Sequence, residues 1–473
     1  MKYAIIGTGV AGIAAIEAIR SVYPSPDGKG QSEAEIVMIG DDPHGYYSRP
    51  GLAYYLTGEL HDKALYPRTA DEYRRMNFRY VKGRVQNILR ETHTLELENH
   101  ASISYDRLLI AVGAQAMPLE VPGAHLDGVL KLDHMEDAKR ILKQARRGKT
   151  AVVVGGGITA LELAEGLLSR GMKVHYLLRG DRYWSNVLDE QESRIVERRL
   201  QEEGVTLLHH AEVIEVIGKN KRVSAVRLLD GRTLKCDVVA YAIGIRPRVE
   251  LAKQAGLAVD RGILVNEYLQ TNDLDIFAAG DVAQAYDPAS GRSVLDSLWT
   301  PARQQGYAAG LNMAGKKSAY IKAPPFNVTR LAGLTTTIIG KVGKGHDDDL
   351  VGIARGDSET WRGLTDALVA QTGFEVNRVR LLIGEKRLLG AIHIRFGLPA
   401  ELPEEITLAI KAADRGAAYL EATELAGFGE SEAKRLFGKD PGLSDSVRRD
   451  YLTPWTAARA EKQFLERFGA VFA

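Results

Sequence analysis

The sequence GTGVAG, Gly7–Gly12, decides the fold of this chain. It follows a short apolar run, Tyr3–Ile6, and leads into a helical pattern. A glycine-rich turn between a strand and a helix lets the backbone approach a phosphate at the helix N-terminus. We therefore expect a dinucleotide-binding unit at the start of the chain, although such a loop taken alone could also be a turn that binds nothing.

A second glycine-rich loop, GGGITA at Gly155–Ala160, occurs in the same context. It follows the apolar run Ala151–Val154 and again precedes a helical pattern. Two loops of this kind in one chain predict two dinucleotides and an α/β fold. The simplest interpretation is a flavin that is reduced by a nicotinamide nucleotide.

Length and composition limit the class of protein. A chain of 473 residues is too long for one compact core, so we expect two to four domains. Its 62 basic and 61 acidic residues give a net charge of +1, which argues against binding to nucleic acid. The sequence contains no apolar run long enough for a transmembrane helix. The first strand begins at Tyr3, which leaves no room for a signal peptide, so we expect a cytoplasmic location.

The single cysteine, Cys236, excludes several redox mechanisms. It lies in Leu234–Val239, a pattern typical of a strand entering a core, so we expect a buried structural thiol. One cysteine cannot form a disulfide within the chain. It also cannot supply a cysteine-ligated iron–sulfur cluster or a cysteine-rich zinc site.

An acidic pair follows the next predicted strand, Glu35–Ile39. In a dinucleotide-binding fold, an acidic residue at this place accepts hydrogen bonds from the ribose hydroxyls. We select Asp42, with Asp41 as the alternative. The other interpretation is that Asp42 belongs to a turn before Pro43.

Two strands that run into small-residue turns, Tyr105–Ala114 and Asp237–Pro247, are interpreted as crossovers between two nucleotide-binding domains. After Pro325 the pattern changes to strands, with a hairpin expected between Arg378–Ile383 and Leu388–Ile394, and a helix near Glu404–Ala417. The predicted domains are an FAD-binding domain at 1–116 and 243–325, a nicotinamide-binding domain at 117–242, an interface or dimerisation domain at 326–425, and a helical extension of unknown role at 426–473.

Four motifs in this order give a family resemblance. They are the two glycine loops, the turn Ala111–Ala114, and TNDLDIFAAGDVA at Thr271–Ala283. With them, residues 1 to about 420 resemble the FAD-dependent pyridine-nucleotide oxidoreductases of the class with two dinucleotide-binding domains. The resemblance implies two Rossmann-like domains and a C-terminal α+β interface domain.

The segment Tyr47–Tyr55 resembles that of rubredoxin and ferredoxin reductases and of the flavin portion of nitrite reductase large subunits. Relatives that reduce disulfides or peroxides carry a redox cysteine in a similar segment, whereas Pro50 stands at that place here. The resemblance therefore implies that the flavin itself passes electrons onward.

The resemblance also assigns cofactor residues. Asp281 would hold the flavin ribityl chain, where the alternative is a helix N-cap. Arg49 would lie near the FAD adenosine or pyrophosphate, and the helix near Trp299–Gly306 would point its N-terminus at the flavin ring. Glu162 would lie near the nicotinamide. The full FAD set is Gly7, Gly9, Ala11, Gly12, Asp42, Arg49, Pro50, Val85, Ala111, Gly113, Asp281, Thr300 and Ala302. The full NAD(P)H set is Gly155, Gly157, Ile158, Glu162, Arg179, Arg182 and Gly244.

The choice between NADH and NADPH depends on the strand Val174–Leu178. NADH-using relatives usually end this strand with an acidic residue, whereas this chain has Leu178 and then a basic turn with Arg179 and Arg182. An arginine can bind a 2′-phosphate with a forked contact, so NADPH is favoured. The alternative is a solvated basic turn that accepts either nucleotide.

Together these features predict an NAD(P)H oxidoreductase whose reduced FAD passes electrons to a protein carrier, such as a ferredoxin, a rubredoxin or a nitrite-reductase-like partner. No catalytic side chain and no metal are required, and the chain could form a homodimer. The alternatives are an NAD(P)H:quinone reductase or oxidase, and a flavoprotein whose redox state controls binding. His346–Asp349 is interpreted as a solvated loop, and the apolar stripe Phe464–Phe472 as a packing face rather than a membrane contact.

Overall fold

The computed structural model describes residues 1–25, 33–287, 290–323, 326–340, 377–384, 387–395, 419 and 429–437. Contacts between residues divide the chain into two compact units. The first contains Met1–Ser185 and Val196–Ala323, and the second contains Asn186–Ile195 and Pro324–Ala473.

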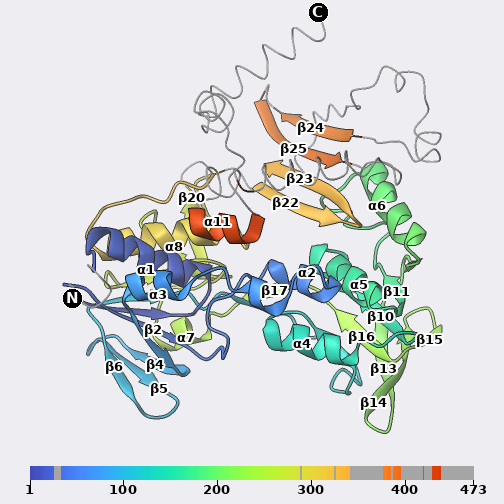
Figure 1. The fold of residues 1–473 in the computed structure, drawn as a ribbon, viewed down its shortest axis with the longest axis horizontal. Helices are drawn as coiled ribbons and strands as arrows, with labels where there is room; N and C mark the ends of the chain where they lie inside the picture. Colours follow the sequence, from blue (N-terminus) through green and yellow to red (C-terminus); the bar gives the residue numbers. More distant parts are fainter. Residues whose placement is uncertain are drawn as a thin grey trace, which may run out of the picture. The chain divides into compact units, whose positions relative to one another are not determined.

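A five-stranded parallel sheet forms the first half of the first unit (Figure 1). Its order is β19 (Ile276–Ala278), β7 (Arg107–Ile110), β1 (Lys2–Ile6), β2 (Glu35–Gly40) and β3 (Arg79–Lys82). Strands β1, β2, β7 and β19 are largely apolar and buried, as expected of a parallel sheet covered on both faces, whereas the edge strand β3 is mostly exposed. The predicted strands at Tyr3–Ile6 and Glu35–Ile39 are therefore confirmed, and β19 returns from far along the chain to the sheet edge beside β7.

A second five-stranded parallel sheet has the same construction. Its order is β12 (Thr206–Leu208), β11 (Lys173–Leu177), β10 (Thr150–Val154), β16 (Val238–Tyr241) and β9 (Val129–Lys131). In each sheet the central strand, β1 or β10, leads through a glycine loop into a helix, α1 (Val10–Val22) or α5 (Ile158–Ser169). The two predicted Rossmann-like domains are thus present.

The two chain crossings between these domains pair with each other. β8 (Ala114–Ala116) and β17 (Ile245–Pro247) form a two-stranded antiparallel ribbon, with Arg246 opposite Gln115. Two further backbone hydrogen bonds extend it, from Met117 N to Gly244 O and from Arg248 N to Gly113 O. The predicted crossovers therefore lie side by side.

Close packing of two helices sets the position of the helix that follows the second crossing. On α8 (Trp299–Met313), a Cβ added at Gly306 would lie 2.1 Å from Ala11 O, and one at Gly310 would lie 2.4 Å from Ala15 O. Only glycine permits this approach of α8 to α1. The contact places the N-terminus of α8 beside the first glycine loop.

The remaining elements surround these cores. In the first unit they are α2 (Gly51–Thr57), a 3₁₀ turn at Asp62–Leu65, α3 (Ala70–Met76), α4 (Met135–Gln144), α7 (Glu250–Gln254), the sheet of β4 (Val85–Leu89), β5 (Thr94–Leu97) and β6 (Ser102–Ser104), the sheet of β13 (Val213–Lys219), β14 (Arg222–Leu228) and β15 (Thr233–Lys235), and the sheet of β18 (Ile263–Val265), β20 (Ala283–Asp287) and β21 (Arg292–Leu295). Helix α6 (Glu190–Glu202) follows the second β–α–β segment along the chain.

The second unit contains an antiparallel sheet in the order β22 (Phe326–Leu331), β23 (Leu334–Gly340), β25 (Arg387–Arg395) and β24 (Asn377–Gly384). Strands β24 and β25 pair as the predicted hairpin. A helix, α11 (Glu430–Phe437), lies in the predicted C-terminal extension. The predicted helix at 404–417, the loop at His346–Asp349 and the stripe at Phe464–Phe472 lie outside the described residues.

Candidate dinucleotide sites

In both loops one position must be glycine, because two backbone segments approach each other closely there. Gly7 has a φ of 116°, and a Cβ there would lie 2.2 Å from Ala111 O. Gly155 has a φ of 141°, and a Cβ there would lie 2.2 Å from Ala242 O. In each domain the loop therefore crosses directly over the end of the neighbouring strand. Gly9 and Gly157 instead face open space, which leaves room for a phosphate beside the backbone.

Helices α1 and α5, which begin at these loops, and helix α8 lack a side-chain cap at their N-termini. None of α1, α5 and α8 has an acidic residue in its first turn or a side-chain cap among the described contacts. By contrast, α3 is closed by a capping box between Thr69 and Glu72. The N–H groups of a first helical turn and the positive end of the helix dipole favour an anion, so these three termini fit phosphate groups or an anionic ring.

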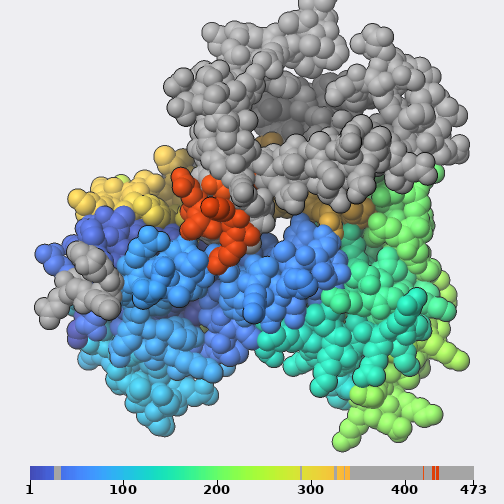
Figure 2. Space-filling view, viewed as in Figure 1, coloured from blue at the N-terminus to red at the C-terminus, as the bar shows by residue number. Residues whose placement is uncertain are grey.

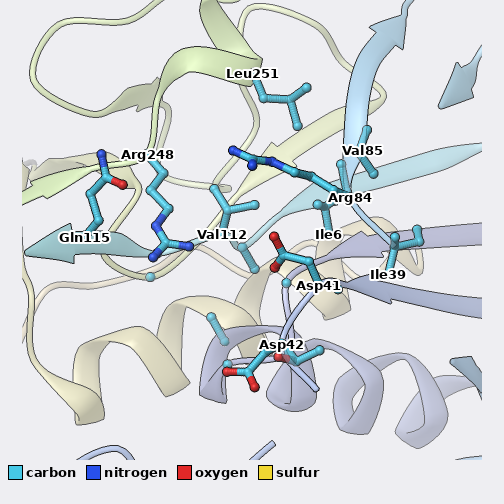
Figure 3. Close-up of a pocket in the computed structure, with 18 of the residues that line it drawn as sticks. Ile6, Ile39, Asp41, Asp42, Arg84, Val85, Val112, Gln115, Arg248 and Leu251 are labelled. Carbon is cyan, nitrogen blue, oxygen red and sulfur yellow. The ribbon is translucent and has the colours of Figure 1, made fainter. Parts of the chain in front are cut away.

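A cavity of about 1080 Å³ lies at the carboxyl ends of the first sheet. Its wall combines apolar side chains such as Ile6, Val112 and Leu251 with acidic and basic ones, and Figure 3 shows Asp41 and Arg248 directed toward the space beside Val112. Of the residues predicted for FAD, the cavity is lined by Gly7, Gly9, Ala11, Asp42, Arg49, Val85, Ala111, Gly113, Asp281 and Ala302. This size and lining fit an elongated nucleotide cofactor.

Three residues predicted for FAD do not line this cavity. Gly12 is buried in α1, where a Cβ would lie 2.4 Å from Gly7 O. Its glycine is needed so that the helix can pack beneath the loop. Pro50 precedes α2 at its N-cap position, and Thr300 lies in the first turn of α8. These two residues position segments that carry lining residues, Arg49 and Ala302.

Both candidate ribose ligands lie at the cavity. Asp41 is exposed, whereas Asp42 is half-buried and its Oδ1 accepts a hydrogen bond from His44 N at 2.9 Å. This bond fixes the turn before Pro43, so the turn interpretation of Asp42 is also satisfied. The structure keeps both carboxylates available to a ribose.

Asp281 directly follows Gly280, near the C-terminal end of the motif Thr271–Ala283. Gly280 has a φ of 79° and donates its N–H to Gln305 Oε1 of α8 at 2.9 Å, which fixes the turn. Burial raises the pKa of Asp281 to about 6, while the charge of Arg49 lowers it and that of Asp296 raises it. A recessed carboxylate of this kind gains stability from hydroxyl or N–H donors brought by a ligand.

Further cavity residues were not predicted from the sequence. They include Arg84, Gln115, Arg246 and Arg248, together with His134 and Glu136 of the second domain. Arg248 also approaches Asp133, with 3.6 Å between Nη2 and Oδ2. The pairing of β8 with β17 places Arg246 and Arg248 close to Gly113. A sequence signal for them existed in GIRPR, Gly244–Arg248, which occupies the second crossing as AVGA occupies the first.

The predicted NAD(P)H residues lie outside the large cavity, on the second glycine loop, on α5, in the turn after β11 and, for Gly244, in the second crossing. Gly155, Gly157 and Ile158 join β10 to α5, and burial raises the pKa of Glu162 on α5 to about 7. Arg179 is exposed in the turn after β11, and Arg182 Nη1 contacts Asp181 Oδ2 at 3.1 Å. Leu178 is only 1% exposed, so a side chain at this position faces the core.

Thiol and metal chemistry have little support in the described part of the chain. Cys236 is 5% exposed between β15 and β16, and burial raises its pKa to about 12. The prediction of a buried thiol is confirmed, although Cys236 lies at a strand junction rather than within a strand. The described residues contain no group of three or more His, Cys, Asp or Glu side chains suited to a metal.

No helix among the described residues has the length and apolar character to cross a membrane.

Comparison with known proteins extends this description. The chain is 31% identical over 312 residues to a nitrite reductase (NAD(P)H) of Bacillus subtilis, which covers 66% of this chain and 37% of that protein. It is 27% identical to the assimilatory nitrate reductase electron transfer subunit of the same organism, over 80% of this chain and 51% of the relative. The chain thus spans about a third to a half of these two relatives.

A solved structure matches more completely. The covalent complex of putidaredoxin reductase with putidaredoxin contains a chain with a TM-score of 0.72 and 27% identity, covering 86% of this chain and 91% of that one. The family described as pyridine nucleotide-disulphide oxidoreductase matches residues 1–306. The chain therefore belongs to the pyridine nucleotide-disulphide oxidoreductase family, which confirms the two cofactors expected from its sequence, FAD and NADH or NADPH.

Proposed function

We propose that this protein is an NAD(P)H oxidoreductase in which FAD passes electrons directly to a protein electron carrier or a reductase partner. The observation that carries the proposal is the absence of a usable thiol. The sequence has one cysteine, and that residue is buried in the core of the second domain with a raised pKa. A dithiol relay within the chain is therefore excluded, so electrons leave from the flavin.

The proposed domains follow the two sheets. Residues 1–116 and 243–325 form the FAD-binding domain and residues 117–242 the NAD(P)H-binding domain. Residues 326–425 form an interface domain that could pair two copies of the chain, and 426–473 an extension without an assigned role. The positions of the ten strands in the two parallel sheets support the first two assignments.

Residues of the first domain hold FAD along its length. The loop Gly7–Gly12 and the N-terminus of α1 receive the pyrophosphate, while Asp42 or Asp41 accepts hydrogen bonds from the ribose. Arg49 and Asp281 act further along the cavity, where the Asp281 carboxylate accepts from the ribityl hydroxyls. The uncapped N-terminus of α8 stabilises negative charge on the reduced ring.

The second domain orients NAD(P)H. Its loop Gly155–Gly157 and the N-terminus of α5 receive the nicotinamide nucleotide's pyrophosphate. When bound beside the first loop, FAD would supply the redox chemistry that links the nicotinamide to the next electron carrier. The exposed Arg179 is free to contact a 2′-phosphate, which supports NADPH as the preferred donor.

Two relatives support a protein partner. One is named as an electron transfer subunit and another is a reductase bound covalently to putidaredoxin. An oxidase or quinone reductase, and a flavoprotein that only switches a binding state, remain the competing functions. They differ from the proposal in the acceptor and in the rate of flavin reduction, respectively.

The first test follows flavin bleaching by anaerobic stopped-flow. We expect NADPH or NADH to reduce the flavin rapidly, and the reduced protein to be reoxidised faster by a ferredoxin or rubredoxin than by dissolved oxygen. Cys236→Ala and thiol alkylation should leave both rates unchanged, because the thiol is buried and protonated. Loss of turnover in a folded, FAD-containing Cys236→Ala protein would contradict the mechanism, as would slow flavin reduction in the wild type.

The second test concerns Asp281. Asp281→Ala should weaken FAD binding by about 1.5–3 kcal/mol, because the ribityl hydroxyls lose a charged acceptor. FAD content per chain after gel filtration, and the dissociation constant by fluorescence, measure the effect. Asp230→Asn, in the exposed turn between β14 and β15, is the matched control and should keep its FAD. Full FAD content in the Asp281→Ala protein would contradict the assignment of Asp281 to the ribityl chain.

The third test concerns the nucleotide preference. Arg179→Ala should weaken NADPH about tenfold and leave NADH nearly unchanged, because only NADPH has a 2′-phosphate for the guanidinium to contact. The readout is the ratio of kcat/KM for the two donors, with exposed Lys173→Ala as the control. Leu178→Glu is not a suitable converse variant for favouring NADH, because Leu178 is buried and a carboxylate there would face the core. If the wild type prefers NADH and Arg179→Ala leaves the ratio unmoved, the basic turn is merely solvated.

A further inference from the structure

The two nucleotide-binding domains are joined covalently only through one ribbon. β8 and β17 run antiparallel through three paired positions, and both chain crossings lie in this ribbon. Two adjacent strands resist rotation about their own axis only weakly, and the described residues supply no third strand to this ribbon. Other contacts must therefore fix the angle between the domains.

Helices α2 and α5 make such a contact (Figure 1). A Cβ added at Gly166 of α5 would lie 2.8 Å from Leu56 Cβ of α2, and Leu56 is 1% exposed. The blue surface of the α2 region directly adjoins the teal surface of the second domain in the space-filling view (Figure 2). The glycine allows the two helices to touch.

Arg170 closes this contact at the helix ends. It is the C-cap residue of α5, and its guanidinium donates from Nε to Leu56 O at 2.9 Å and from Nη2 to Tyr55 O at 3.2 Å. These carbonyls belong to the last turn of α2, which has no basic residue of its own. A cation that binds C-terminal carbonyls is stabilised by the helix dipole. One side chain of the second domain therefore caps a helix of the first.

The two helices that Arg170 joins both begin at cofactor sites. Helix α2 starts directly after Arg49 and Pro50, and Arg49 lines the FAD cavity. Helix α5 starts at the glycine loop that is assigned to NAD(P)H. The segment before α2 is held to the second domain as well, because Tyr47 OH accepts a hydrogen bond from Met135 N at 2.9 Å and His44 Nε2 lies 2.6 Å from Glu136 Oε1.

We propose that Arg170 is a positioning residue for hydride transfer, which sets the nicotinamide against the flavin by tying the far ends of α2 and α5 together. The proposal rests on the proposed function. Hydride transfer requires the reacting atoms to be held about 3–3.5 Å apart, so a small rotation between the domains lowers the rate steeply. Arg170 itself touches neither cofactor site, so substrate affinity should change little.

The test is anaerobic stopped-flow of the full-length, FAD-loaded protein over a range of NADPH and NADH concentrations. Arg170→Met keeps much of the side-chain length but removes the donors. We expect its limiting rate of flavin reduction to fall about tenfold, while the dissociation constant of the nucleotide and the FAD content stay within about twofold of wild type. Arg170→Lys, which keeps the positive charge but has one donor nitrogen in place of Nε and Nη2, should recover part of the rate. Ser169→Ala, at the adjacent exposed position, should behave as wild type.

A second variant tests the same contact independently. Gly166→Ala inserts a methyl group between α5 and Leu56 and should also lower the limiting rate without changing nucleotide affinity. If Arg170→Met does not fold, this variant decides the matter. Limiting rates equal to wild type in folded Arg170→Met, or in Gly166→Ala when Arg170→Met does not fold, would overturn the proposal even where the thermal midpoint falls. Failure of the proposed function is distinguishable in the wild type itself: either neither nucleotide reduces the flavin rapidly, or the reduced flavin is reoxidised no faster by a protein carrier than by oxygen.

Discussion

The passage of each glycine loop across a neighbouring strand end is the constraint on which the rest of the structure depends. At Gly7 and at Gly155 the position of a Cβ is occupied by a carbonyl oxygen, that of Ala111 or of Ala242. This approach places the loop and the following helix N-terminus at the carboxyl end of the sheet, where the strand order reverses. The same backbone arrangement therefore builds two candidate nucleotide sites. The packing of α8 on α1 brings a further helix N-terminus to the first of these sites.

The chain has a single cysteine, which is buried, so the proposed electron path runs through the two nucleotide sites without a thiol. In the described structure, the segment before α2 carries Arg49 to the cavity and holds tyrosine and histidine contacts to the second domain. Under the proposed function, this segment both contributes to the FAD site and braces the two domains. The flavin is left as the exit point for electrons, and Arg170 strengthens the same brace at its far end.

Local patterns predicted what is local in this fold. The glycine loops and the strands that precede them follow from residue type and spacing, and Asp281 follows from the family resemblance; the structure places most of the predicted FAD residues around one cavity. Arg84, Arg246 and Arg248 were missed because they reach the cavity through strand pairing between distant segments. The limits of motif reading also appear within the motifs, since Gly12 serves helix packing and Leu178 faces the core. Solvent exposure, which separates a ligand-facing position from its neighbour, cannot be read from the strand pattern alone.

The most direct test of the central claim is the number of electrons that the protein takes up. Anaerobic titration of the oxidised protein with dithionite, followed by the flavin absorbance, should reach full reduction at about two electrons per FAD, because the proposed mechanism uses the flavin as its single redox group. An uptake of about four electrons per FAD would reveal a second two-electron centre and would contradict the account.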